Sequence, residues 1–145
     1  MNKNGHSTAR RTPDDFWQLE GGGRVIVPRL RLARGFWGRA IGLIGRRTLA
    51  PGEGLWIEPC RAIHTAFMRF PIDALFLSPE GEIVDAVFHL RPWRWKAADR
   101  RARSVVEMRA GELDPNVLPM GARLHRRPLI CSAAEVPARE SPRPE

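Results

Sequence analysis

The chain has 145 residues, 43% hydrophobic and 28% charged, which is the composition of an ordinary globular domain with a single core. No apolar run approaches the roughly 20 residues of a membrane span, and the N-terminal residues contain no apolar secretory signal, so we expect a cytoplasmic protein without a membrane span. The formal net charge is +8, but residues 1–50 carry +7 of it, residues 51–100 carry −1 and residues 101–145 carry +2.

The polar ends of the chain predict tails on either side of one domain. Residues 1–23 are basic and end in three consecutive glycines, which predicts a flexible N-terminal tail. Residues 132–145 contain three prolines and alternating charges with little to bury, so we expect a disordered C-terminal tail. Residues 24–131 would then form a single mainly-β domain.

The first half of this domain alternates strands with one short helix. In residues 24–33 apolar side chains alternate around Pro28, which predicts an edge strand with a bulge at that proline. Apolar side chains recur at helical spacing within residues 36–47, but several glycines limit the helix to two turns. Residues 54–60 and 61–70 predict two further strands, the second lying between two prolines.

The second half contains the clearest elements. Two strands, residues 72–77 and 82–90, flank the sequence SPEG, whose proline and glycine suit a tight turn. SVVEMRAG predicts another strand, LDPNVLPMG a short helical turn and ARLHRRPLI a closing strand. The sequence therefore predicts a mainly-β fold, a compact sandwich or open barrel of six to seven short strands with one or two short helices.

Cys60, His64 and Asp73 lie close together in the sequence and are the first candidates for chemistry. On an extended strand Cys60 and His64 share a face but lie about 13 Å apart, too far for a thiol–histidine pair unless the strand is broken between them. Cys60 is therefore either a nucleophile or a small buried hydrophobic residue. Because Cys60 and Cys131 form no C-x-x-C pair, we expect no zinc site built from thiolates and no other metal site.

Asp73 and His64 could also meet across neighbouring strands. The pair would be either a structural network or a positioned acid–base pair, and Asp73 also suits the capping of backbone N–H groups. Arg69 could pair with Asp73 or bind an anion. Trp93 and Trp95 alternate with cations in RPWRWK, which is typical of a ligand-stacking groove or of a strand end whose tryptophans cover the sheet.

Five blocks of the sequence resemble one known family. They are RGFWGRAIGLIGRRTLAPGEGLW, CRAIHTAFMRFPIDALFLSPEGEIV, LRPWR, VVEMRAG and GARL, in the order found in domain of unknown function 192, also called uncharacterised protein family 0127. The resemblance covers roughly residues 25–127 and implies a compact mainly-β fold with short helices. It brings no established reaction, substrate or cofactor, so we expect no cofactor. The matching positions are Gly42, Arg46, Gly54, Cys60, His64, Met68, Asp73, Phe76, Glu107 and Gly111.

Two segments depart from the family pattern. Members often have Trp-Met-Lys-Asn where this chain has His64, Thr65, Ala66 and Phe67, so no role of that lysine or asparagine is carried over. Members also often have Gly-Asp where this chain has glycine and alanine at residues 121–122, so no role is carried over for that aspartate either.

Together these features predict a non-enzymatic binding or accessory domain. A groove near His64, Arg69, Asp73, Trp93 and Trp95 would bind a small molecule or an extended peptide, the peptide by strand addition. Two alternatives stay open. One is an enzyme of hydrolase or transferase type that uses Cys60 or a His64–Asp73 acid–base pair. The other is a nucleic-acid binder that uses the N-terminal arginines.

Overall fold

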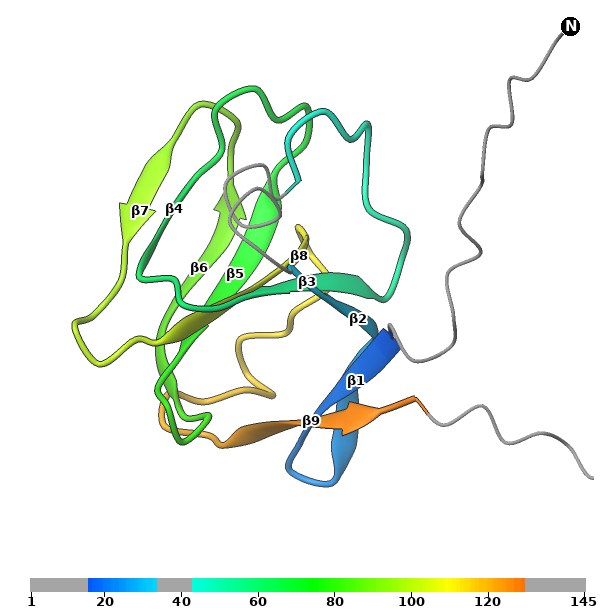
Figure 1. Ribbon diagram of the computed structural model, residues 1–145, viewed down its shortest axis with the longest axis vertical. Coiled ribbons are helices and arrows are strands. Elements are labelled where there is room, and N and C mark those ends of the chain that lie inside the picture. Colours follow the sequence, from blue (N-terminus) through cyan, green and yellow to red (C-terminus); the bar gives the residue numbers. More distant parts are fainter. Residues whose placement is uncertain (1–15, 34–42, 130–145) are drawn as a thin grey trace, which may run out of the picture.

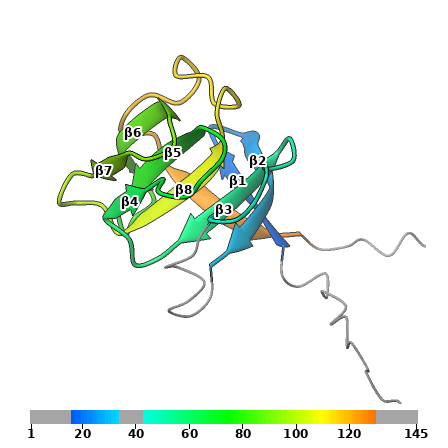
Figure 2. The ribbon, with the colours of Figure 1, turned by 90° about the horizontal axis from the view of Figure 1, so that it is seen from above.

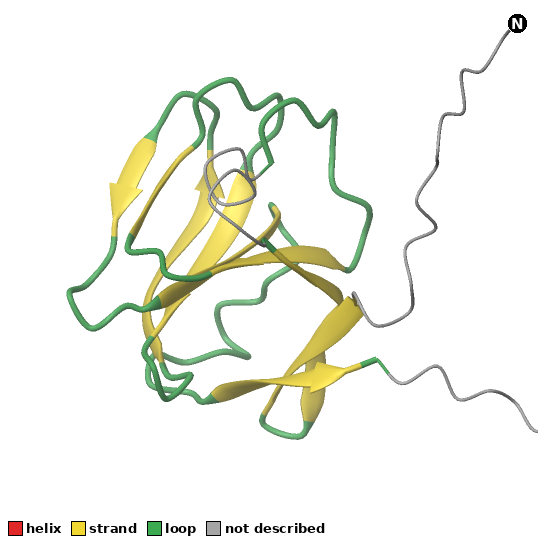
Figure 3. Ribbon diagram, in the orientation of Figure 1, coloured by secondary structure: helices red, strands yellow, loops and turns green. Residues whose placement is uncertain are grey.

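The computed structural model describes residues 16–33 and 43–129 (Figure 1). Within these residues the chain forms nine strands and no helix (Figure 3), so the mainly-β prediction is confirmed. None of the described segments is a helix of the length and apolarity that crossing a membrane would require. The strands are β1 (Phe16–Gly21), β2 (Arg24–Leu32), β3 (Glu53–Ile57), β4 (Ala62–His64), β5 (Ile72–Leu77), β6 (Ile83–Leu90), β7 (Trp95–Ala97), β8 (Ser104–Arg109) and β9 (Leu124–Pro128).

Seven of these strands form one sheet in the order β6-β5-β8-β3-β2-β1-β9. The pairs are antiparallel except β2 and β3, which are parallel. The sheet curls like half of a barrel, so that β9 crosses the direction of β5 and β6 (Figure 1). β4 and β7 form a separate two-stranded sheet, which lies on the side of the molecule opposite to β1 and β2 (Figure 2).

Each face of the large sheet packs against its own hydrophobic cluster. Alternation along β5 sends Ala74 and Phe76 into one cluster and Leu75 and Leu77 into the other, so every residue of this strand is buried. The first cluster is covered by side chains from outside the sheet, namely Leu43, Leu49, Ile63, Met68 and Phe70. The second cluster lies inside the curl, where Leu19, Leu30 and Leu124 close it.

The hairpin predicted between residues 72 and 90 is confirmed. β5 has the predicted bounds, and β6 begins at Ile83. The Ser78 hydroxyl oxygen shapes the turn, because it accepts hydrogen bonds from the N–H groups of Glu80 and Glu82, each at 3.2 Å. Gly81 takes the left-handed conformation that the turn needs, with φ of 83°.

The prediction of an edge strand at residues 24–33 is wrong, because β2 lies between β1 and β3. The irregularity expected at Pro28 is present: the register with β1 shifts there, so that Pro28 and Arg29 lie opposite Gln18. Pairing with β3 begins only at Arg29. The proline therefore lies where β3 needs no N–H donor, which is why an inner strand accepts it.

The large sheet begins earlier than predicted, because β1 lies within residues 1–23, the segment predicted as a flexible tail. Gly22 and Gly23 have φ of 57° and 75° and form the turn of a β1–β2 hairpin. The glycine run thus marks a turn between two strands, an interpretation that the sequence analysis did not consider. Residues 1–15 and 132–145 of the predicted tails lie outside the described residues, as does most of the helix predicted within residues 36–47. LDPNVLPMG forms turns rather than a helix.

Candidate functional site

Three exposed aromatic side chains gather where β4 leaves and β7 enters the small sheet. Phe67, Trp93 and Trp95 are 65%, 59% and 69% exposed, and we call them the aromatic platform. Phe67 and Trp93 pack edge to face, with ring centroids 4.7 Å apart. Large aromatic groups that pack on one another outside a core leave apolar surface in water, which is typical of an interaction site.

The backbone beneath this platform is strained. Phe67 and Trp93 have φ of 62° and 61°, in the left-handed region that side chains bearing a Cβ rarely adopt. The conformation costs roughly 1–2 kcal/mol per residue. Strain of this kind persists only where the surrounding structure enforces it, and it concentrates at functional sites.

Buried Thr65 enforces the strained conformation. Its hydroxyl donates to the carbonyl of Arg91 at 2.7 Å and accepts the N–H of Arg94 at 2.9 Å. Its backbone N–H donates to the Arg94 carbonyl at 2.8 Å, and its carbonyl accepts the N–H groups of Trp93 and Met68 at 3.0 and 3.2 Å. One side chain thus ties two loops together, and the strand predicted for residues 61–70 ends at residue 64 because these bonds turn the chain away.

Three arginines lie within two positions of Phe67 or Trp93 in the sequence. Arg69, Arg91 and Arg94 are exposed, and no carboxylate of the described residues lies within ion-pair distance of them. Lys96, by contrast, binds the carboxylate of Asp85 at 2.8 Å. The three arginines therefore leave their charge available to a partner, and an anionic group is the partner they suit.

His64 joins the same surface. Along β4 its neighbour Ile63 is buried while His64 is exposed, and His64 lies directly opposite Trp95 in the register with β7. Directly opposite side chains of an antiparallel pair share a face and lie within contact range. Four of the five predicted binding residues, His64, Arg69, Trp93 and Trp95, therefore belong to the β4–β7 sheet and its loops.

Asp73, the fifth candidate, lies elsewhere and has a different task. Its side chain is completely buried on β5. One carboxylate oxygen accepts the N–H of His89 at 2.8 Å, and the other accepts those of Gly111 and Leu113 at 2.8 and 3.4 Å. Among its hydrogen bonds within the described chain there is none with His64 or Arg69. Asp73 caps backbone N–H groups, which was one of the two interpretations open from the sequence.

Cys60 lacks the features of an activated nucleophile. Its Sγ donates to the carbonyl of Ala62 at 3.1 Å, and the half-buried side chain packs against the first hydrophobic cluster. Burial raises the pKa of the thiol, and the negative charge of Glu107 raises it further. Both effects disfavour the thiolate, whereas catalytic cysteines sit in surroundings that favour it.

Glu107 is the residue that sequence reasoning missed. It lies in the middle of β8, between Leu55 and Ala74 of the neighbouring strands, and is 4% exposed. Burial raises the pKa of its carboxyl to about 7. No hydrogen-bond donor from the described part of the chain contacts its side chain. Glu107 is among the positions that match the family, and it is a single carboxylate within the apolar run SVVEM, but neither feature led to a predicted role.

The family model DUF192, described as an uncharacterized ACR, matches residues 18–126. The chain belongs to the DUF192 family. A DUF192 relative, a UPF0127 protein of Pyrococcus furiosus, is 32% identical over 111 residues, which cover 74% of this chain and 95% of the relative. The resemblance drawn from the five sequence blocks is therefore confirmed.

Two crystal structures share the fold of this DUF192 chain. A protein of unknown function from Novosphingobium aromaticivorans is similar with a TM-score of 0.66 at 20% identity, over 76% of this chain and 83% of that one. A candidate transcription regulator of Sinorhizobium meliloti is similar with a TM-score of 0.63 at 24% identity, over 76% of this chain and 91% of that one. At these identities the likeness shows the DUF192 fold alone.

Proposed function

We propose that this chain is a non-enzymatic binding protein that captures an extended acidic segment of a partner protein on the aromatic platform. The observation that carries the proposal is the combination of exposed aromatic side chains on strained backbone with neighbouring arginines that form no ion pair with any described residue. Aromatic and arginine side chains are the groups that contribute most to binding at protein interfaces.

The shape of the platform favours an extended segment. Its three aromatic side chains are each more than half exposed, so a partner would lie across them, whereas small-molecule sites enclose most of their ligand. β4 and β7 each have one edge that no other described strand occupies. A peptide could add to such an edge by main-chain hydrogen bonds while its side chains contact the aromatic groups.

The charges favour acidic side chains in that segment. Arg69, Arg91 and Arg94 would pair with carboxylates, and apolar side chains between these carboxylates would contact Phe67 and Trp93. We therefore expect a sequence in which acidic and apolar residues alternate. This charge pattern supports a protein partner with negative charge near its apolar contact residues.

The two alternatives have less support. Enzymatic use of Cys60 would need a depressed pKa, but the pKa of this thiol is raised. An acid–base pair of His64 and Asp73 would need contact between them, whereas Asp73 binds three backbone N–H groups. Binding of nucleic acid by the N-terminal arginines would involve Arg10 and Arg11, which lie outside the described residues, as well as Arg24 and Arg29 of β2. The oligonucleotide probe in the binding experiment tests this alternative.

The test is fluorescence anisotropy with three labelled probes: a decapeptide of alternating glutamate and leucine, its glutamine counterpart, and a single-stranded oligonucleotide of equal length. We expect the acidic peptide to bind at least tenfold more tightly than the other two. Trp93→Ala and Arg94→Ala should each weaken this binding at least tenfold. The matched control is Met120→Ala, because Met120 is also an exposed apolar residue but lies outside the platform.

Three outcomes would contradict the proposal. They are preference for the oligonucleotide, absence of binding by the acidic peptide, and equal weakening by Met120→Ala and Trp93→Ala. Preference for the oligonucleotide would instead favour the nucleic-acid alternative. Its dependence on the N-terminal arginines can then be measured by deleting residues 1–15.

A further inference from the structure

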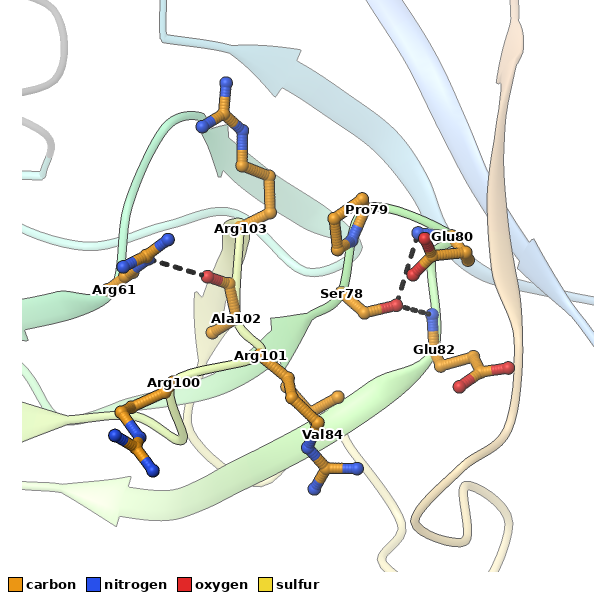
Figure 4. Close-up of a pocket in the computed structure, with 10 residues that line it drawn as sticks. All are labelled: Arg61, Ser78, Pro79, Glu80, Glu82, Val84, Arg100, Arg101, Ala102 and Arg103. Atoms are coloured by element: carbon orange, nitrogen blue, oxygen red, sulfur yellow. Dashed lines mark hydrogen bonds between the residues drawn. The ribbon is translucent and has the colours of Figure 1, made fainter.

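A second candidate site lies at the other end of the β4–β7 sheet, away from the platform. Ala62 pairs with Ala97 at this end, and His64 pairs with Trp95 at the platform end. Next to Ala62 and Ala97 a cavity of about 630 Å³ opens between the β5–β6 turn and the loop from β7 to β8 (Figure 4). We call it the arginine pocket, because Arg61, Arg100, Arg101 and Arg103 line it.

We propose that the arginine pocket binds a small phosphorylated polyol, such as a sugar phosphate. This proposal does not depend on the function proposed for the platform, because the two sites share no residue. Its starting point is the charge of the lining, in which four arginine residues border a cavity whose volume lies within the usual range of small-molecule sites, roughly 300–1,000 Å³.

The arginines of the pocket differ in how far they are already paired. Arg101 binds Asp99 at 2.9 Å, and Arg103 lies 3.7 Å from Glu58. Arg61 uses only its Nε, which donates to the carbonyl of Ala102 at 3.2 Å. For Arg61 and Arg100, no carboxylate within the described ranges lies at ion-pair distance. These two guanidinium groups are therefore the ones that a phosphate would engage, by the paired N–H bonds that arginine makes with phosphate oxygens.

The opposite wall supplies acceptors. In Figure 4, Arg61 and Arg100 lie at one end of the pocket, and Glu80 lies at the other. Glu82 is already bound to Arg123 at 2.8 Å, whereas Glu80 has no ion pair with any described residue. A carboxylate accepts hydrogen bonds from hydroxyl groups but repels a second anionic group. The pocket thus suits a ligand with phosphate at one end and hydroxyl groups at the other.

The pocket is already formed and lacks aromatic groups. Ala102 is 1% exposed, and its N–H donates a hydrogen bond to the carbonyl of Asp99. The N–H of Arg103 donates to the carbonyl of Leu77 at 2.7 Å, which anchors the loop to the end of β5. The Ser78 hydroxyl oxygen anchors the facing turn. No aromatic side chain belongs to the described lining, so a nucleobase would find no stacking surface. A sugar phosphate therefore fits better than a nucleotide.

The test is titration calorimetry of the full chain with ribose 5-phosphate, ribose and inorganic phosphate. We expect saturable binding of ribose 5-phosphate, with ribose and inorganic phosphate each at least tenfold weaker. Arg100→Ala should weaken ribose 5-phosphate binding at least tenfold. Because the Arg100 side chain has no hydrogen bond or ion pair with a described residue, the unfolding temperature should stay the same. Glu80→Gln should weaken ribose 5-phosphate more than inorganic phosphate.

The control is Arg109→Ala, which removes another exposed arginine from the end of β8. Arg109→Ala should leave the affinity unchanged. Equal weakening by Arg100→Ala and Arg109→Ala would overturn the site, since it would indicate attraction by net charge alone. Absence of saturable binding of ribose 5-phosphate, or equal affinities for ribose 5-phosphate and inorganic phosphate, would overturn the ligand class.

Discussion

Folded proteins usually bury apolar side chains and expose charged ones, and the two sheets of this protein depart from that rule in opposite ways. The large sheet buries two carboxyl groups, Asp73 and Glu107, in an apolar interior. The small sheet and its loops expose three aromatic groups, Phe67, Trp93 and Trp95. In the large sheet the cost of burying a carboxyl group is reduced within the molecule. N–H groups donate to Asp73, and the raised pKa of Glu107 favours its neutral form. Nothing described in the chain covers the aromatic groups, and this exposure is the basis of the binding function proposed above.

The largest effect is expected from Asp73→Ala. The substitution leaves the N–H groups of His89, Gly111 and Leu113 without their acceptor. Each buried donor without a partner costs about 1–3 kcal/mol, and two of the three hydrogen bonds are only partly buried, so the free energy of unfolding should fall by roughly 3–5 kcal/mol. Urea unfolding followed by tryptophan fluorescence measures this change.

Asp114→Ala is the matched control. Asp114 is exposed and accepts the N–H of Asn116 at 2.9 Å in a turn, so its removal should cost less than about 1 kcal/mol. A loss for Asp73→Ala no greater than that for Asp114→Ala would show that Asp73 is not the structural residue described above.

Glu107→Gln should change how stability depends on pH. The pKa of the Glu107 carboxyl is about 7 in the folded chain and 4.5 in the unfolded chain, so between these values the folded state binds more protons. Stability therefore falls as pH rises through this window, and the loss is complete above about pH 7. Between pH 5 and pH 8 the wild-type chain should lose about 2–3 kcal/mol relative to Glu107→Gln, as measured by urea unfolding of both proteins.

Comparison at two pH values removes any constant cost of the buried amide. Glu80→Gln is the control, because Glu80 is exposed and its removal should leave the pH profile of the wild type unchanged. If the difference between the wild type and Glu107→Gln is the same at pH 5 and pH 8, the carboxyl group does not titrate in this window.

The smallest effect on stability is expected from Trp93→Gly. Glycine adopts positive φ without steric cost, so the substitution should relieve strain at φ of 61° and raise the free energy of unfolding by up to about 1 kcal/mol. Trp95→Gly, within β7, should instead lower it by roughly 0.5–1 kcal/mol, because glycine weakens a strand. Thermal unfolding compares the two variants. Equal destabilisation by both would mean that Trp93 stabilises the fold rather than straining it.

Local patterns predicted the large sheet better than the small one. The hairpin at residues 72–90 depends on two largely apolar runs and on the tight turn between them, all visible within 19 consecutive positions. The small sheet depends on Thr65, whose hydrogen bonds reach Arg91 and Arg94, 26 and 29 positions further along the chain. No local pattern contains that information. The local pattern therefore predicts a long strand where the structure has three residues followed by a turn.

The candidate site was predicted in part for the same reason. His64, Arg69, Trp93 and Trp95 attract attention by residue type, and the structure places all four in or beside the small sheet. Asp73 is separated from them because its oxygens bind backbone N–H groups contributed by β6 and by the turn after β8. Glu107 and the arginine pocket were missed. The pocket brings Arg61 and Arg100 into one lining, although they lie far apart in the sequence.

By itself the sequence determined the fold class, the family and the residue types available for binding. These follow from alternation, turn residues and motif order, which act over short stretches of chain. Only the tertiary structure decided that the buried carboxyl group of Asp73 has hydrogen-bond donors, whereas that of Glu107 has none among the described residues. It also decided that Phe67 and Trp93 face water on strained backbone. Those outcomes depend on hydrogen bonds and burial between distant segments, which exist only once the chain has folded.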